Sequence, residues 1–437
     1  MELAIPTPLT FSVELQAHVA YYHEFQFEQP PKDRNGAAPI LIPSEHNCEP
    51  SAGGKHLVDT IKQGLRDIGC RVFPDAVTPC NPINISLIHP EYYSWDVEFD
   101  MEAKDMPEGY ENHLGLSWTG IRIKSPAMWA CHTNFDEVAR VFREIKKVFI
   151  LLSTQTCDLS VLVRRGDRPF DLFELQRIAG LCYASSSLLS MLHDRSRHES
   201  SRCLSNRFYS ELAIREFRPK NDEEDSLNEE YITSTSESAR AVPTVDSGFV
   251  RIIPRGTLQP EPFNLDIYKE TTRHYQAVYG QNRMHAEPLG IIPAVGTLLE
   301  CTEQTRIADL MNHITDRTAY KFLNYIARDE NIKRPWNKTA VEFCQARGTL
   351  DVDSIVLWVK ICVRLSIFAI DEGYQMYRRL IRQCARAERA PQNYDALDLL
   401  LDVGLVDEAA MLQSQILRRN REAPWQMEPR ETTPHHS

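Results

Sequence analysis

The sequence lacks the patterns that mark secreted, zinc-binding and membrane-spanning proteins. Its eleven cysteines occur singly, with no Cys-x-x-Cys pair and an odd total, which argues against both a disulfide framework and a zinc knuckle. No apolar run approaches the roughly 20 residues that cross a bilayer, and the N-terminal MELAIPTPLTF has neither a basic start nor a long apolar core. We therefore expect a soluble, intracellular protein, in the cytoplasm or the nucleus, with no membrane partner.

The sequence is also poor in net positive charge and in glycine-rich phosphate loops. The formal net charge is -12 and the isoelectric point about 5.7, whereas a protein that coats nucleic acid presents a basic surface. Neither of the usual glycine-rich phosphate-binding motifs is present, and no repeat of roughly 20 to 50 residues occurs. These absences predict no nucleic-acid partner, while they leave room for a small polyanionic ligand.

What the sequence does contain is a series of strand and helix patterns in a chain of 437 residues, enough for two or three average domains or one large one. Residues 9–22 alternate as a strand does, and residues 26–54, rich in Pro, Gly and Asn, predict a loop. Residues 56–69 carry apolar side chains at helical spacing and end at a glycine, which predicts a helix. Residues 92–103 and 115–128 predict two strands, joined by an acidic loop, that pair antiparallel.

The next segments continue this mixed order. Residues 135–149 predict a helix with one apolar side, and residues 157–166 predict a strand. Asp171 and Glu174 match an acidic capping box, which predicts that a helix begins there and runs toward His193. Helices and strand pairs in this order, with long connections, predict an α+β fold around a mainly antiparallel sheet.

The middle of the chain changes in composition. Residues 218–248 lose their apolar periodicity and are dominated by acidic and hydroxyl side chains, which predicts a disordered insertion. Residues 248–256 predict a strand that resumes the fold, and residues 305–313 predict a helix.

The last part of the sequence is helical in pattern. Asp351 is placed to cap a strong helix, whose apolar stripe is Ile355, Trp358, Cys362, Leu365 and Ala369. Further helical segments follow to about residue 420. We therefore predict one domain over residues 9–404, interrupted by the acidic insertion, and a terminal helix with a disordered tail over residues 405–437.

One carboxylate draws attention because it lies inside a strand pattern. In TAVEFCQARGTLD, residues 339–351, Val341 and Phe343 predict one face of a short strand, and Glu342 and Cys344 the other. A glutamate in such a place is also compatible with a solvated residue on an edge strand. A functional role for Glu342 therefore depends on partners elsewhere in the chain.

Four stretches of sequence form a recognisable series. They are FSVEL near the start, GIRIKSPAM, CDLSVLVRRG followed by FDLFELQRIAGLCYA, and KTAVEFCQARGTLDVDSIVLWVKICV. In order and spacing they resemble the amidoligase family found widely in fungi, which is related to glutamine synthetase and glutamate-cysteine ligase, over roughly residues 9–370. The resemblance implies an antiparallel sheet that forms a funnel for ATP and Mg²⁺. It also implies a reaction in which ATP activates a carboxylate as an acyl phosphate and an amine captures it.

The resemblance further implies which residues would hold the nucleotide and the metal. The family pattern has a Glu-x-Glu strand, a Glu in a GxEIxSP strand, a His-x-His strand and a Glu-x-Arg strand. In this sequence Glu14 and Glu342 match two of the carboxylates and are the implied metal ligands, and the implied cofactor-binding residues are Glu14, Gln16, Arg122 and Glu342. The sequence departs from the pattern at five positions: Gln16 and Arg122 replace glutamates, Ser160 and Leu162 replace the histidines, and Cys344 replaces the arginine. Asp100, before the SP motif, and Arg197, after the helix, resemble two further family positions.

These replacements make the implied site more positive. Glu to Gln and Glu to Arg shift the charge by three units, and Arg to Cys takes one back. A cation about 4 Å from Mg²⁺ is repelled by roughly 2 kcal/mol in water and several-fold more at an effective dielectric constant of about 20. We therefore expect weakened metal binding, with the alternative that Arg122 replaces the metal and holds a phosphate directly.

Two functions stay open on this reading. The first is an ATP- and Mg²⁺-dependent carboxylate-amine ligase with an altered site, acting on a small-molecule carboxylate and an amine. The second is a catalytically inactive relative, a pseudoenzyme that keeps the fold to bind a small ligand or a protein partner.

Other candidate sites have less specific patterns. Two histidines and two cysteines are conceivable metal ligands, but their spacing is irregular: His193, His198, Cys182 and Cys203. A nucleophilic role for Cys157 or Cys344 would need a base within hydrogen-bond reach. The basic stretch RRLIRQCARAER from Arg378 predicts the solvated face of a helix or, alternatively, a membrane or partner surface.

Overall fold

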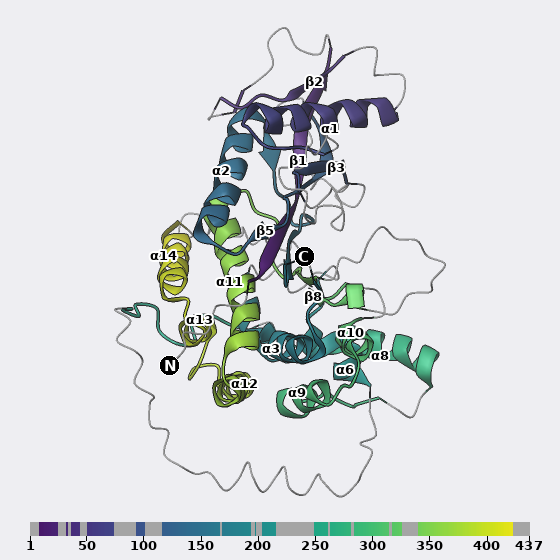
Figure 1. The fold of residues 1–437 in the computed structure, drawn as a ribbon, viewed down its shortest axis with the longest axis vertical. Helices are drawn as coiled ribbons and strands as arrows, with labels where there is room; N and C mark the ends of the chain where they lie inside the picture. Colours follow the sequence, from purple (N-terminus) through teal and green to yellow (C-terminus); the bar gives the residue numbers. More distant parts are fainter. Residues whose placement is uncertain are drawn as a thin grey trace, which may run out of the picture.

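A computed structural model of the chain shows a nine-stranded sheet beside a set of helices (Figure 1). The structure describes residues 8–24, 32–33, 36–43, 50–73, 93–100, 116–166, 168–193, 197, 203–215, 249–260, 263–280, 284–313, 317–325 and 340–422. The predicted acidic loop after residue 101, the predicted insertion at 218–248 and the predicted tail lie outside these residues.

The sheet has the strand order β3-β4-β1-β7-β9-β8, with three short strands that also pair with β1. The strands in this path are β3 (Asp96–Phe99), β4 (Ser117–Lys124), β1 (Thr10–His23), β7 (Leu159–Arg164), β9 (Val341–Phe343) and β8 (Tyr320–Lys321). The short ones are β2 (Ile40–Ile42), β5 (Met128–Trp129) and β6 (Leu151–Leu152). The β1–β2 pair is parallel and the other pairs of these strands are antiparallel. The predicted α+β class with a mainly antiparallel sheet is confirmed.

Helices surround the sheet and form a second group beside it (Figure 1). They are α1 (Pro50–Asp67), α2 (His132–Val148), α3 (Leu172–Ser190), α5 (Asn206–Tyr209), α6 (Glu211–Ile214), α8 (Leu265–Tyr279), α9 (Ile291–Leu299), α10 (Gln304–Met311), α11 (Val352–Asp371), α12 (Tyr374–Arg389), α13 (Ala396–Asp402) and α14 (Val406–Glu422), with a 3-10 turn at Leu323–Tyr325. In Figure 1, α1, α2 and the upper half of α11 accompany the sheet, and α3, α9, α10 and α12 lie together below it. Across the part of the chain that is described, none of the helices has the length and apolar character needed to cross a membrane.

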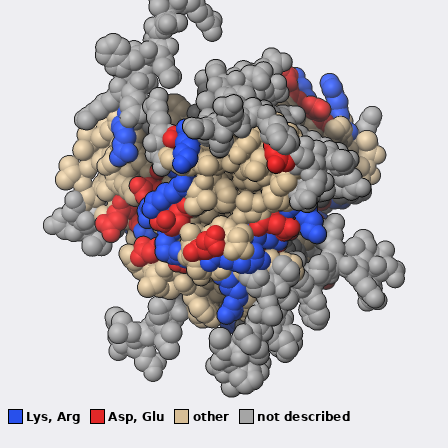
Figure 2. Space-filling model, turned by 90° about the horizontal axis from the view of Figure 1, so that it is seen from above, with Lys and Arg blue, Asp and Glu red and all other residues tan. Residues whose placement is uncertain are grey.

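The surface carries both signs of charge in close mixture where it is seen from above. Figure 2 shows basic and acidic side chains next to one another on that side, and no wide field of one sign.

The apolar core lies on one side of the central strand. Val13, Leu15 and Ala17 of β1 are fully buried, and they belong to the same cluster as Val138 and Phe142 of α2. Burying side chains of this size contributes about 1.5–3 kcal/mol each relative to leaving them exposed. Because side chains alternate along a strand, the same packing leaves Ser12, Glu14, Gln16 and His18 on the opposite face.

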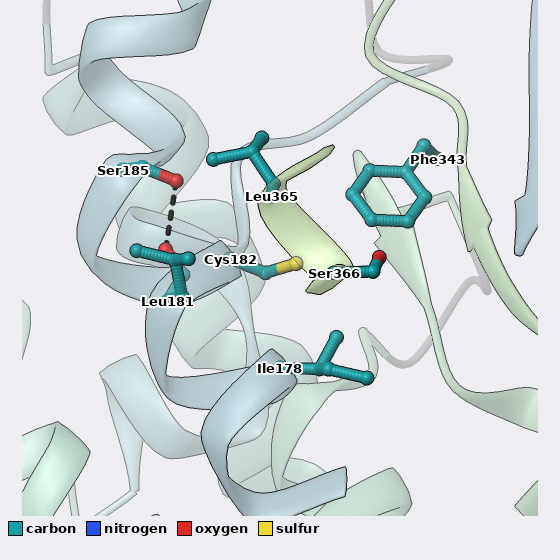
Figure 3. Close-up of a pocket in the computed structure, with 7 residues that line it drawn as sticks. All are labelled: Ile178, Leu181, Cys182, Ser185, Phe343, Leu365 and Ser366. Carbon is teal, nitrogen blue, oxygen red and sulfur yellow. Dashed lines mark hydrogen bonds between the residues drawn. The ribbon is translucent and has the colours of Figure 1, made fainter. Parts of the chain in front are cut away.

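Helix α11 passes through the core between the sheet and α3. A small gap between α3, β9 and α11 is lined by Ile178, Leu181, Cys182, Ser185, Phe343, Leu365 and Ser366 (Figure 3). It leaves no room for a water molecule, and Ser185 donates a hydrogen bond to the Leu181 carbonyl (2.7 Å) within its own helix. This region is therefore packed core.

Several local sequence signals correspond to observed elements. At the start of α3, Glu174 N donates to Asp171 Oδ1 (2.8 Å) and Asp171 N donates to Glu174 Oε2 (3.0 Å), so the predicted capping box is confirmed. Gly69 follows α1 with φ of 86°, a conformation that favours glycine. The five predicted stripe residues of α11 are all buried, although the N-cap Asp351 accepts from Ser354 Oγ (2.5 Å) and makes no cap bond to the backbone.

Two predictions about elements were wrong. The loop predicted at 26–54 contains β2, and α1 begins within it at Pro50. The strand predicted at 248–256 is absent from the described residues 249–256. There the N–H groups of Ile252 and Ile253 donate to Gln413 Oε1 of α14 (2.7 and 3.0 Å), so the segment packs on the C-terminal helices. Helices α8 and α9 were not predicted.

Candidate ligand-binding face of the sheet

The polar side chains of the central strands line one face of the sheet, called here the polar face. The strand register sets them in rows, because directly paired residues point to the same side. Glu98, Arg122 and Gln16 form one row; Lys124, Glu14 and Ser160 form the next; Leu162, Glu342 and Lys321 form a third. The structure thus places all four residues implied by the resemblance, Glu14, Gln16, Arg122 and Glu342, on the same face.

Arg122 lies between two carboxylates on this face. Its Nε and Nη2 donate to Asp100 Oδ2 (3.1 and 3.0 Å), and its Nη1 is 3.9 Å from Glu14 Oε2. The Asp100 side chain is only 4% exposed, against 30% for Arg122. Asp100 therefore has its negative charge compensated inside the protein by the guanidinium.

Both polar atoms of the Gln16 side-chain amide are hydrogen-bonded. Its Nε2 donates to the same Asp100 Oδ2 (2.8 Å), and its Oε1 accepts from the backbone N–H of Asp158 (2.9 Å). The oxygen that could have coordinated a metal weakly is thus already a hydrogen-bond acceptor. Arg197 extends this network, since it contacts Asp158 Oδ1 (2.5 Å) and donates to the Cys344 carbonyl (2.9 Å).

Glu342 belongs to a second cluster, two strands away from Glu14 in the sheet order. Its Oε1 accepts from Cys344 Sγ (3.0 Å) and is 3.6 Å from Lys321 Nζ, and Ser160 Oγ donates to the same sulfur (3.4 Å). Burial raises the pKa of the Cys344 thiol well above its usual range, and the Glu342 carboxylate adds to this. Cys344 and Glu342 both raise the pKa of Lys321, and because the thiol is neutral, the Glu342 carboxylate supplies the charge that stabilises the ammonium.

Lys321, the cation that contacts Glu342, was not predicted from the sequence. Lys321 lies on a two-residue strand that shows no alternation to predict it. Its ammonium also lies beside Cys344, the position at which the resemblance implies an arginine. Asp100 similarly adds a carboxylate beside Arg122.

The remaining candidate nucleophiles and bases are buried. His18 is 1% exposed, its Nε2 is 3.2 Å from Thr154 Oγ1, and burial lowers its pKa while the Asp100 charge opposes this. Cys157 is fully buried and burial raises its pKa. Both cysteines named in the sequence analysis, Cys157 and Cys344, are therefore held as neutral thiols, which are weak nucleophiles.

The residues present on the polar face do not fit a Mg²⁺ ion. Mg²⁺ requires carboxylate oxygens that can approach to about 2.1 Å in octahedral geometry, whereas Asp100 Oδ2 already accepts three hydrogen bonds and Glu342 is engaged by Lys321 and Cys344. Within the described ranges, no three His, Cys, Asp or Glu side chains are grouped to hold a metal ion. Of the other suggested ligands, Cys182 and Cys203 are buried, His193 packs against Trp358 (4.7 Å between ring centroids), and His198 lies outside the described residues.

Comparisons with protein-family models, with curated proteins and with solved structures found no match to this chain. The resemblance to amidoligases, with its ATP and Mg²⁺, stays a prediction.

Proposed function

We propose that this protein is a catalytically inactive relative of the ATP-dependent carboxylate-amine ligases, which keeps the sheet as a binding scaffold. The observation that carries the proposal is the position of Arg122, whose guanidinium lies between the carboxylates of Asp100 and Glu14. A ligase of this kind needs a divalent cation beside such carboxylates to hold the triphosphate. Here the chain's own side chain takes that place.

The electrostatic consequence is large compared with ordinary binding energies. A guanidinium about 4 Å from a divalent ion opposes its binding by roughly 2 kcal/mol in water and on the order of 8 kcal/mol at an effective dielectric constant of about 20. Since about 1.4 kcal/mol is a factor of ten in affinity, even the lower value weakens metal binding more than tenfold. In the alternative in which Arg122 holds a phosphate directly, the phosphate competes with Asp100, to which Nε and Nη2 of the guanidinium already donate.

A second candidate is an active ligase with a rearranged site. It is favoured by Lys321, which places an ammonium beside Cys344 where the family pattern has an arginine, and by Asp100, which supplies a carboxylate beside Arg122. In this reading Lys321 binds a phosphate of the nucleotide, and the substrates are a small carboxylate and an amine.

Thermal-shift titrations with ATP and Mg²⁺, separately and together, distinguish the two candidates. For the inactive relative we expect no metal-dependent rise in melting temperature at millimolar ligand. A rise that requires both ligands and disappears in Glu342→Ala would support the ligase instead.

A gain-of-binding variant sharpens the test. Arg122→Glu replaces the internal cation with a third carboxylate near Asp100 and Glu14, so its melting temperature should be low in chelator and should recover with millimolar Mg²⁺. Arg122→Gln, which removes the charge but adds no carboxylate, is the matched control and should show no such recovery. Equal responses of the two variants would contradict the assignment of this position to a cation.

A further inference from the structure

The solvent-facing side of α12 carries arginines at helical spacing. Arg378, Arg382, Arg386 and Arg389, called here the arginine stripe, fall within one arc of about 80° on the helix. The opposite side is buried and consists of Tyr377, Leu380, Ile381, Cys384 and Ala387. The helix lies at the lower edge of the molecule in Figure 1.

The arginine stripe has no ion-pair partner among the described residues. The one acidic residue of the helix, Glu388, is used by Arg207 (2.5 and 3.0 Å), and Arg378 only packs over the Tyr374 ring (5.4 Å). Helix α2 shows how this chain arranges an ordinary solvated face: Arg140 pairs with Glu137 and Lys147 with Glu144, both at 2.7 Å.

Keeping four like charges on one helix face costs stability. The pairs 378/382 and 382/386 are four residues apart and 386/389 three apart, and like charges at these spacings destabilise a helix by about 0.2–0.5 kcal/mol each. The stripe is also a local reversal of sign in a chain with a net charge of -12. A surface that maintains such a repulsion is suited to a negatively charged partner.

We propose that the arginine stripe docks an acidic peptide segment of a partner protein. Guanidinium groups bind carboxylates through paired hydrogen bonds, which ammonium groups cannot do. The stripe spans 12 residues of helix, a rise of about 16 Å from its first to its last arginine, which matches about five residues of extended peptide. Tyr374 and Met376, 54% and 44% exposed, offer apolar contacts at the first turn of the helix. The inference is independent of the polar face and of its proposed role.

The observations favour a peptide over the other common polyanions. The apolar side of α12 is packed into the core, so this helix cannot insert a hydrophobic face into a bilayer as membrane-bound amphipathic helices do. A nucleic acid is attracted by a broad basic surface, whereas the stripe is one helix wide on an acidic protein.

Fluorescence anisotropy of a labelled octaglutamate peptide with the full-length chain tests the proposal. We expect saturable binding at about 50 mM salt that weakens as salt rises, and a loss of about tenfold or more in affinity for Arg382→Glu/Arg386→Glu. The control Arg143→Glu/Lys147→Glu makes the same charge change on exposed positions of α2 and should lose less than about threefold. Circular dichroism confirms that both variants are folded.

Three results would overturn the proposal. They are an absence of binding at low salt, an equal loss in the α2 control, and tighter stripe-dependent binding of a single-stranded oligonucleotide or of phosphatidylserine vesicles than of the peptide.

Discussion

Replacing Arg122 with methionine should reveal how far the sheet depends on its internal cation. The change keeps the aliphatic stem but removes both hydrogen bonds to Asp100, at 3.1 and 3.0 Å, and leaves a carboxylate that is 4% exposed. Breaking a buried ion pair from one side costs about 3–5 kcal/mol. Because Gln16 still donates to Asp100 at 2.8 Å and Arg122 is itself 30% exposed, we expect a smaller loss, about 2–3 kcal/mol of unfolding free energy.

Urea unfolding followed by circular dichroism measures this loss, and the same strand offers a matched control. Lys124 lies two residues further on the same face and pairs at 2.6 Å with Glu98, whose side chain is 47% exposed. Lys124→Met should therefore cost less than about 1 kcal/mol. The double variant Arg122→Met/Asp100→Asn should recover part of the loss, since it leaves no buried charge at position 100. If Arg122→Met and Lys124→Met cost the same, the reasoning about Arg122 is wrong.

Two further predictions concern parts of the fold away from the polar face. Burial, with smaller contributions from the charges of His274 and Arg317, lowers the pKa of His313 to about 4 from an ordinary value of 6.5. The unfolded chain therefore binds the proton of this imidazole more tightly than the folded chain does. As the pH falls from 7 to 5, His313 should lower the unfolding free energy by about 2 kcal/mol. Urea titrations at the two pH values should show that His313→Gln lacks this part of the pH dependence. At Gly180, an added Cβ would lie 2.5 Å from Tyr377 Oη and 3.2 Å from Val295 Cγ1, so Gly180→Ala should cost about 1–3 kcal/mol. Gly296 lies in α9, and no atom outside its own helix backbone is within 4 Å of an added Cβ, so Gly296→Ala should instead raise the unfolding free energy by about 0.5–1 kcal/mol. Urea unfolding midpoints in the opposite order for the two variants would contradict the packing described.

Local signals in the sequence predicted many of the elements, because they act over a few residues. The capping box at Asp171 and Glu174 sets the start of α3 without reference to the rest of the molecule. The alternation around Glu342 places Val341 and Phe343 on the buried side of β9 for the same reason. Where the pattern was short or mixed, as at Ile252 and Ile253, tertiary contacts with Gln413 decided the structure, and the sequence alone could not show them.

The candidate site was predictable only in part, since its members come from distant segments. Period-2 alternation predicted that Glu14 and Gln16 share one face of their strand, whereas Arg122 and Glu342 were assigned to the same site only through the resemblance. Asp100 resembles a family position, but the sequence does not predict its contact with Arg122. It directly follows β3, where its N–H donates to the Gly120 carbonyl, so strand alternation does not indicate the direction of its side chain. Lys321 reaches Glu342 through the pairing of β8 with β9, which no local pattern encodes.

The pairing of strands also explains how charges on the polar face are compensated inside the protein. A side chain on one strand faces its cross-strand partner at about 4.5–5.5 Å between Cβ atoms, so a charge on one strand can be compensated from the neighbouring strand. Lys321 and Glu342 are such a pair, 3.6 Å apart across β8 and β9, and Asp100, which directly follows β3, accepts two hydrogen bonds from Arg122 of β4. Both contacts compensate partly buried charges with the chain's own groups. Under the proposal of an inactive ligase relative, these groups stand where an active enzyme would hold its metal and phosphate, and Arg122→Glu tests whether a divalent cation can bind there.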